Sequence, residues 1–195
     1  KKCLPNAKLK DAERLVNWVR VVKSSAEIKL MQSAARIVES GMKTAFKSIN
    51  PGVRQCDAVA EIQKALFNGT KEFGGDYPSI ATLLPTGKGT SASHLTHTDE
   101  KFVSGEATII EIAGAYKRYH CPMARTVLLG EKDQKKIDTM KATNEALEAG
   151  IAVTKPGNIV DDVAQKFWGV LDKYKIKKDS RTGYSIGIGS VSYTH

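Results

Sequence analysis

The fold of this chain is decided by residues 106–130, EATIIEIAGAYKRYHCPMARTVLLG. The first half of this stretch is rich in isoleucine, and a second apolar run follows a short basic break. Two neighbouring runs of this kind are typical of paired antiparallel strands. The pattern predicts a β-hairpin with strands over 106–113 and 118–129, joined near Gly114 through Lys117.

The residues before the hairpin predict helices followed by an irregular segment. Helices are expected over 8–23, from Ser25 as N-cap to the Asn50-Pro51-Gly52 break, and over about 54–68. Gly, Pro and Ser then interrupt residues 74–94, GGDYPSIATLLPTGKGTSASH. This composition predicts a strand near residues 79–84 and a loop that carries His94.

The segment after the hairpin repeats the pattern of the earlier helices. Helices are expected over about 132–153 and 159–174, and YSIGIG predicts a final strand. The segment INPGVRQCDAVAEIQKAL matches TKPGNIVDDVAQKFWGVL at an offset of 105, and the Ser-Ile pairs at 79–80 and 185–186 match at 106. If these are not simply two unrelated helix pairs, a second hairpin is expected near residues 211–235, and the second half is incomplete here.

Composition excludes several classes of protein. The chain has 195 residues, of which 41% are hydrophobic and 26% charged, as is typical of a globular domain with a core. No apolar run approaches the about 20 residues of a membrane-spanning helix. Three dispersed cysteines and no visible export signal favour a cytoplasmic protein. The net charge of +9 is scattered over predicted helix faces, which favours a solvated surface and argues against a nucleic-acid partner. An anionic small-molecule substrate also fits this charge, and no membrane partner is expected.

Glu111 and His94 are the candidate catalytic residues. If Ile109 and Glu111 share a face of the strand, the carboxylate points at an apolar layer and requires a partner or ligand. Glu111 in solvent on an edge strand is the alternative. His94 lies in the polar loop SASHLTHTD, a typical place for an acid–base group, with a hydrogen-bonded structural role as the alternative. Cys121 is either a nucleophile or a small core residue.

The segment SASHLTHTD, the hairpin sequence and GYSIGIG together resemble the pita-bread fold family of creatinases, prolidases and methionine or Xaa-Pro aminopeptidases. The resemblance covers residues 24–189 and implies an α+β fold with two pseudo-symmetric αα-ββ halves, the second incomplete. It implies that 1–23 is a linker helix from an N-terminal domain outside this chain, and that 24–195 is a truncated C-terminal catalytic domain. A homodimer is expected for the full-length protein.

The resemblance also implies roles for single residues. His94 matches the histidine that most members use as a substrate-facing acid or proton donor. Glu111 and Pro122 fall where metal-dependent members have two metal-binding aspartates, and Tyr184 falls where they have a ligand histidine in a GHGIG-like motif. Because proline has no ligating side chain, we expect no metal site and no cofactor.

Within the metal-free branch, AGAYKRYHCPMARTVLLG and GYSIGIG are most similar to ectoine hydrolases. This similarity implies a hydrolase that opens the C–N bond of a cyclic amidine, from ectoine to N-acetyl-2,4-diaminobutyrate. Glu111 would be the nucleophile or base and His94 the proton shuttle, with Tyr184 and Tyr119 binding the substrate. The alternatives are a metal-dependent Xaa-Pro dipeptidase or aminopeptidase, a creatinase, and a non-catalytic pita-bread module that binds protein or nucleic acid.

Overall fold

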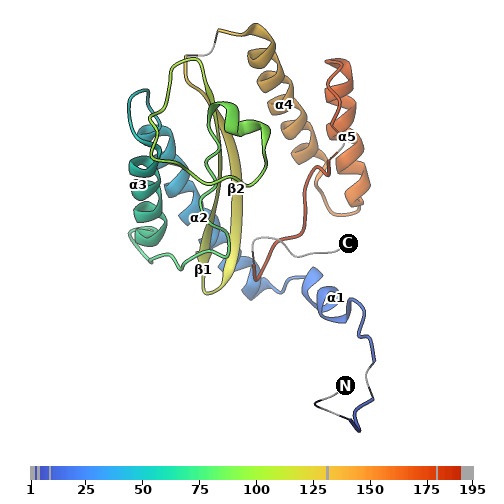
Figure 1. Cartoon of the computed structure of the whole chain (residues 1–195). Coiled ribbons are helices and arrows are strands. Elements are labelled where there is room, and N and C mark those ends of the chain that lie inside the picture. Colours follow the sequence, from blue (N-terminus) through green and yellow to red (C-terminus); the bar gives the residue numbers. More distant parts are fainter. Residues whose placement is uncertain (1–2, 4, 9, 131, 179, 190–195) are drawn as a thin grey trace.

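The computed structural model describes residues 3, 5–8, 10–130, 132–178 and 180–189. Figure 1 shows two helices packed along a long hairpin, with a further helix pair to one side of it. The elements follow in the order α1 (Leu15–Val21), α2 (Ser25–Ser48), α3 (Gln55–Asn68), the 3-10 helix η1 (Gly87–Ser91), β1 (Ala107–Tyr116), β2 (Tyr119–Leu128), α4 (Gln134–Val153) and α5 (Val160–Lys173).

The expected hairpin is confirmed, but its turn lies further along the chain than the expected Gly114 through Lys117. β1 and β2 pair antiparallel from Ala107 opposite Leu128 to Tyr116 opposite Tyr119. The turn consists of Lys117 and Arg118, whose φ angles are 47° and 71°. Two positive φ values in a two-residue loop match the twist of a hairpin. Gly114, expected at the turn, is therefore inside β1.

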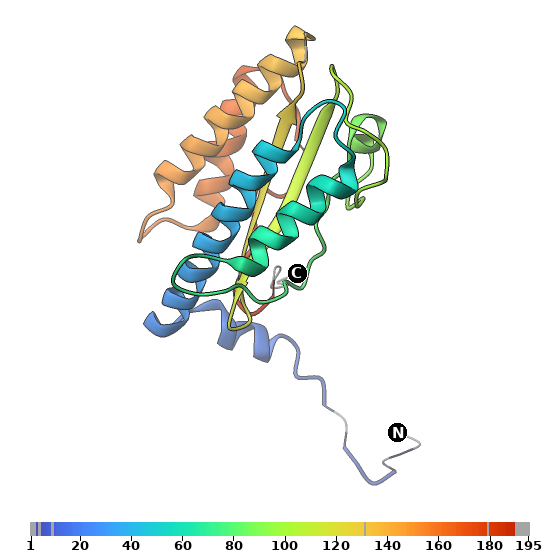
Figure 2. The ribbon, with the colours of Figure 1, turned by 90° about the vertical axis from the view of Figure 1, so that its left-hand side faces the viewer.

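A close backbone approach explains the glycine at this strand position. A Cβ atom at Gly114 would lie 2.2 Å from the Ala34 carbonyl oxygen and 2.6 Å from the Val38 nitrogen, both in α2. A glycine inside a strand commonly marks such an approach of another backbone. Figure 2 shows α2 and α3 side by side on this face of the hairpin.

The main core lies between α2, α3 and the hairpin. Its fully buried residues come from all three, together with Leu84 and Phe102 from the connecting segments. Ile110 and Ile112 are its members from β1. On α2 and α3 the buried positions are Ile37, Val38, Met42, Ala45, Ala58, Val59, Ile62 and Leu66.

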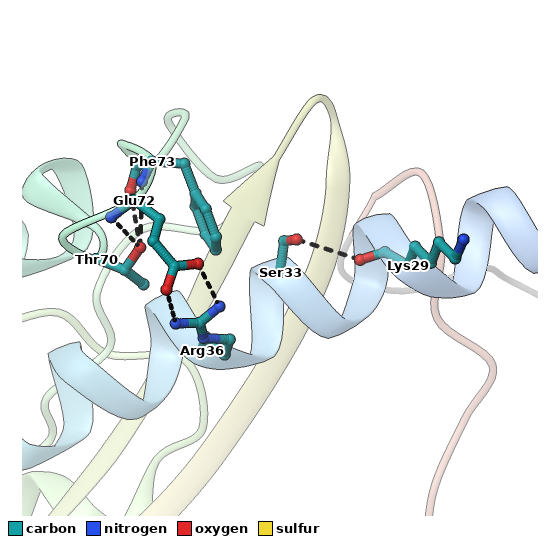
Figure 3. Close-up of polar contacts among 6 residues, drawn as sticks. All are labelled: Lys29, Ser33, Arg36, Thr70, Glu72 and Phe73. Carbon is teal, nitrogen blue, oxygen red and sulfur yellow. Dashed lines mark hydrogen bonds and ion pairs between the residues drawn. The ribbon is translucent and has the colours of Figure 1, made fainter.

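Polar contacts fix the start of α2 and join α2 to the segment that follows α3. The N-cap of α2 is Ser24 rather than the expected Ser25, because Glu27 completes a capping box: Ser24 N–H donates to Glu27 Oε2 (2.7 Å) and Glu27 N–H to Ser24 Oγ (3.3 Å). Arg36 of α2 donates two hydrogen bonds to Glu72, in the segment that follows α3, and lies over the Phe73 ring (Figure 3).

The chain before α2 is helical only over Leu15–Val21, less than the expected 8–23.

The internal repeat recurs in the helix boundaries. α2 ends at Ser48 and α4 at Val153, while α3 covers 55–68 and α5 covers 160–173, all at one offset of 105. The glycines between the helices, Gly52 and Gly157, have φ angles of 88° and 96°. α4 and α5 form a separate small core around Phe167, Val170 and Leu171.

Two expected strands form isolated bridges instead. Leu83 pairs with Glu111 and Thr86 with Thr108, whereas a continuous strand was expected over residues 79–84. Pro78 and Pro85 flank this segment and lack the N–H that a ladder requires. In the YSIGIG segment, Ile188 pairs with Tyr119. Among the helices of the described residues, none is long and apolar enough to cross a membrane.

Replacing Gly114 tests the close approach of β1 to α2. We expect Gly114→Ala to destabilise the protein by about 1–3 kcal/mol, because the added methyl overlaps the α2 backbone. The matched control is Gly169→Ala in α5, where a Cβ has open space, so the loss of glycine should stabilise by about 0.5–1 kcal/mol. Urea unfolding followed by circular dichroism measures both. Equal effects of the two substitutions would contradict the packing described here.

Candidate active site

The alternation of β1 places Glu111 on the face that points away from α2. Ile110 and Ile112 are buried in the main core, so Ile109, Glu111 and Ala113 project from the opposite face. Glu111 pairs with Ala124, and Ala113 pairs with Pro122. Directly paired residues share a face, so Pro122 lies beside Glu111.

Glu111 does not lie on a free strand edge. Its N–H donates to the Leu83 oxygen and its oxygen accepts from the Leu83 N–H, both at 3.0 Å. Ile109 N–H donates to the Pro85 oxygen at 3.0 Å. β1 is therefore bonded on both sides at this position, and the edge-strand alternative for Glu111 is excluded.

Glu111 and His94 line one cavity of about 330 Å³. The cavity lies between β1 and the loop after Leu83, and η1 contributes its last turn. His94 is exposed and has a φ of 62°, a left-handed conformation uncommon outside glycine. The other lining residues are Leu83, Pro85, Thr90, Ser91, Ala92, Ser93 and Ile109.

The polar lining of this cavity includes hydroxyl groups that sequence analysis missed. Thr90 Oγ1 donates to the Gly87 oxygen (2.7 Å) and Ser91 Oγ to the Lys88 oxygen (2.9 Å), within their own 3-10 turn. The signal for them was the Ser/Thr-rich run before His94, which was interpreted only as a loop. None of the described lining residues is a lysine or arginine, so Glu111 gives the cavity a negative charge.

The two tyrosines expected at the site lie in different places. The pKa of Tyr184 is raised, first by partial burial and then by the negative charge of Glu111. Tyr119 instead donates to Glu27 Oε1 at 2.9 Å, and this hydrogen bond raises the pKa of Tyr119. Neither tyrosine is among the residues that line the Glu111–His94 cavity.

The donor set around Glu111 does not fit a two-metal centre. Pro122 and Ala124 are its neighbours on the same face of the hairpin. Cys121 packs against the main core on the other face, and burial raises the pKa of its thiol, as expected for a core residue. Among the residues that the structure describes, no group of three His, Cys, Asp or Glu side chains lies close enough to hold a metal.

A second and larger cavity of about 900 Å³ lies between the hairpin and α4. Phe46, Leu128 and Leu147 are among its lining residues, whereas Glu111 and His94 are not. The candidate chemistry is therefore restricted to the smaller cavity.

Comparison with known proteins places this geometry in a family. The model of metallopeptidase family M24 matches residues 29–193. The ectoine hydrolase of Halomonas elongata is 44% identical over 191 residues, covering 95% of this chain and 48% of that protein. An uncharacterized hydrolase/peptidase of Sinorhizobium fredii is 38% identical over 187 residues, covering 96% and 48%. The chain thus spans about half the length of the curated relatives it matches.

Solved structures share the fold. The prolidase from Pyrococcus furiosus aligns with a TM-score of 0.84 at 19% identity, covering 95% of this chain and 54% of that one. An Xaa-Pro dipeptidase from Bacillus anthracis aligns with a TM-score of 0.84 at 21% identity, covering 97% and 53%. These matches confirm the expected pita-bread fold, and the chain covers about half of each of these structures. Because the family model spans most of its sequence and the fold agrees, the chain belongs to metallopeptidase family M24.

Proposed function

We propose that this chain is part of a hydrolase that opens the C–N bond of a cyclic amidine, with ectoine as the substrate and without a metal ion. The observation that carries the proposal is the shared cavity of Glu111 and His94. The similarity to an ectoine hydrolase supports the choice of substrate.

The charge and size of the cavity suit such a substrate. An amidinium group is a planar cation, and the carboxylate of Glu111 is the complementary charge on a wall formed otherwise by apolar and hydroxyl-bearing residues. A volume of about 330 Å³ is appropriate for a small molecule. The negative charge of Glu111 contributes to the raised pKa of Tyr184. We assign Tyr184 to substrate binding, and Tyr119 to holding the hairpin tip against α2.

The reaction requires a nucleophile and a proton donor. The amidinium carbon is already electrophilic. Either the Glu111 carboxylate attacks it directly, or Glu111 accepts a proton from a water molecule that attacks it. The ring C–N bond then breaks, and His94 supplies the proton to the departing nitrogen. Direct attack forms a C–O bond to Glu111 and, once the ring C–N bond has broken, leaves an imidate ester on Glu111 whose carbon is still bonded to the second nitrogen. Water then hydrolyses this intermediate and frees the carboxylate, so both routes consume one water and give an amide and an amine.

Glu111→Gln tests the role of the carboxylate. We expect ectoine turnover to fall by at least about 10³-fold, since an amide is neither a base nor a nucleophile of comparable strength. Glu61→Gln on the exposed face of α3 is the matched control and should leave turnover unchanged. The assay is release of the ring-opened product, with circular dichroism as a check on folding. Wild-type turnover in Glu111→Gln would refute the proposal.

His94→Gln tests the proton shuttle. Turnover should fall by about 10²–10⁴-fold, because glutamine keeps hydrogen-bonding capacity but transfers no proton at neutral pH. His97→Gln, three residues further along the same exposed loop, changes a histidine that does not line the cavity. Its turnover should match the wild type. Equal losses in both variants would indicate a loop effect instead of proton transfer.

The competing function is that of a metal-dependent Xaa-Pro dipeptidase, which the fold of the solved prolidases favours. Dialysis against a chelator separates the two functions. We expect ectoine turnover to survive chelation unchanged, because the donor set at Glu111 does not fit two metal ions. Cleavage of an Xaa-Pro dipeptide that is lost on chelation and restored by manganese would favour the dipeptidase.

A further inference from the structure

Two distant segments of the chain meet at the imidazole of His120. The His120 side chain is only 5% exposed. Ser79 N–H points at its Nε2 at 2.9 Å, and Gly189 N–H points at its Nδ1 at 3.0 Å, so a backbone donor faces each ring nitrogen. The Arg118 oxygen lies 2.9 Å from the same Nδ1. The backbone N–H of His120 donates to the Gly187 oxygen at 2.8 Å.

These segments lead to the residues of the candidate site. Ser79 precedes Leu83, which is bonded to Glu111 through two backbone hydrogen bonds, and the chain continues into the His94 loop. Residues 187–189 directly follow the segment that carries Tyr184. Both segments contain a Ser-Ile pair, at 79–80 and 185–186, related by the internal repeat. His120 is therefore a point at which the two halves of the repeat are joined.

His120 itself is too far from Glu111 to act on the same substrate atom. Ala115 pairs with His120, and Ala115 lies four residues after Glu111 on the same face of β1. At the rise of a strand, four residues span about 13 Å. A contribution of His120 to the reaction must therefore act through the segments that it holds.

The protonation state of the ring decides which contacts it makes. A neutral imidazole has one N–H and one acceptor nitrogen. The ring can therefore accept from Ser79 or from Gly189, but not from both. Acceptance from Ser79 at Nε2 leaves Nδ1–H to donate to the Arg118 oxygen, and the 187–189 segment is then held by the backbone N–H of His120, which donates to the Gly187 oxygen. Burial lowers the pKa of His120, while the negative charge of Asp76 opposes that shift.

Charged side chains lie near His120 on two sides. Asp76, in the segment before Ser79, accepts a hydrogen bond from Arg118 N–H. On the α1–α2 side, Lys23 lies next to Gly187, and Glu27 accepts from Tyr119. Above the lowered pKa of His120, the neutral ring accepts the Ser79 N–H at Nε2. Below that pKa, Nε2 is protonated and no longer accepts.

We propose that His120 is a positioning residue of the active site. Its neutral Nδ1–H imidazole holds the Ser79 segment, and its backbone N–H holds the 187–189 segment, so that both segments stay in register on the Glu111 face. The inference rests on the proposed function for its kinetic consequence. Its structural content stands on the contacts of His120 alone.

Nuclear magnetic resonance of the protein tests the structural content directly. The ¹⁵N shifts of His120 should show the neutral Nδ1–H tautomer at pH 7. Amide exchange of Ser79, corrected for its intrinsic rate, should accelerate at least tenfold in His120→Asn, whose shorter side chain ends near the Nδ1 position. It should change less in His120→Gln, whose oxygen reaches the Nε2 position. An Nε2–H tautomer, or equal Ser79 protection in all three proteins, would overturn the proposal.

Kinetics then test whether the contacts position the site. With ectoine as substrate, His120→Asn should lower kcat at least tenfold and His120→Gln should restore most of that loss, while the exposed His97→Gln is the control. Unchanged kcat in His120→Asn, together with the expected loss of Ser79 protection, would overturn the positioning role. Unchanged turnover in Glu111→Gln would refute the proposed function, and the tautomer and exchange results would still decide what His120 holds.

Discussion

The approach of β1 to the backbone of α2 at Gly114 is the constraint on which the rest of the structure depends. Because no side chain separates the two at this point, Ile110 and Ile112 enter the core between α2 and α3. Alternation along the strand then leaves one orientation for Glu111, away from the core. A one-residue slip of β1 would bury the carboxylate against α2 and expose two isoleucines. The position of the acidic group thus follows from a packing requirement on the opposite face of the strand.

The side chains that the hairpin presents differ from the donors that a two-metal centre requires. A dinuclear site needs several carboxylate and histidine donors in one place, whereas the hairpin presents Glu111 beside Pro122 and Ala124. A single carboxylate suits a substrate that already carries positive charge, since the electrophile then needs no Lewis acid. The loop that ends at His94 forms the other wall of the cavity, and the backbone of His94 is left-handed, with a φ of 62°.

Much of the architecture followed from local sequence pattern. The boundaries of α2 to α5 and the repeat were predictable because apolar periodicity and the Pro-Gly breaks act within a few residues, whereas the helix expected over 8–23 covers only Leu15–Val21. The shared face of Ile109 and Glu111 followed from strand alternation. The strand position of Gly114 was not predictable, since its cause is a contact with a helix some 80 residues earlier in the chain. The contacts of Tyr119 with Glu27 and of His120 with Ser79 are likewise long-range, and no local pattern signals them.

The equal spacing of the helix pairs bears on how such a protein evolves. α3 and α5 have the same length at one offset, so the two halves share one structural plan. The segment around Ser79 contacts the His120 ring, whereas the 187–189 segment accepts from the His120 backbone N–H. A substitution that moves the Ser79 segment or the 187–189 segment therefore also changes the position of His120, to which the other segment is bonded. Divergence in one half is therefore constrained by the other half, and substitutions that move either segment are expected to be accepted in pairs more readily than singly.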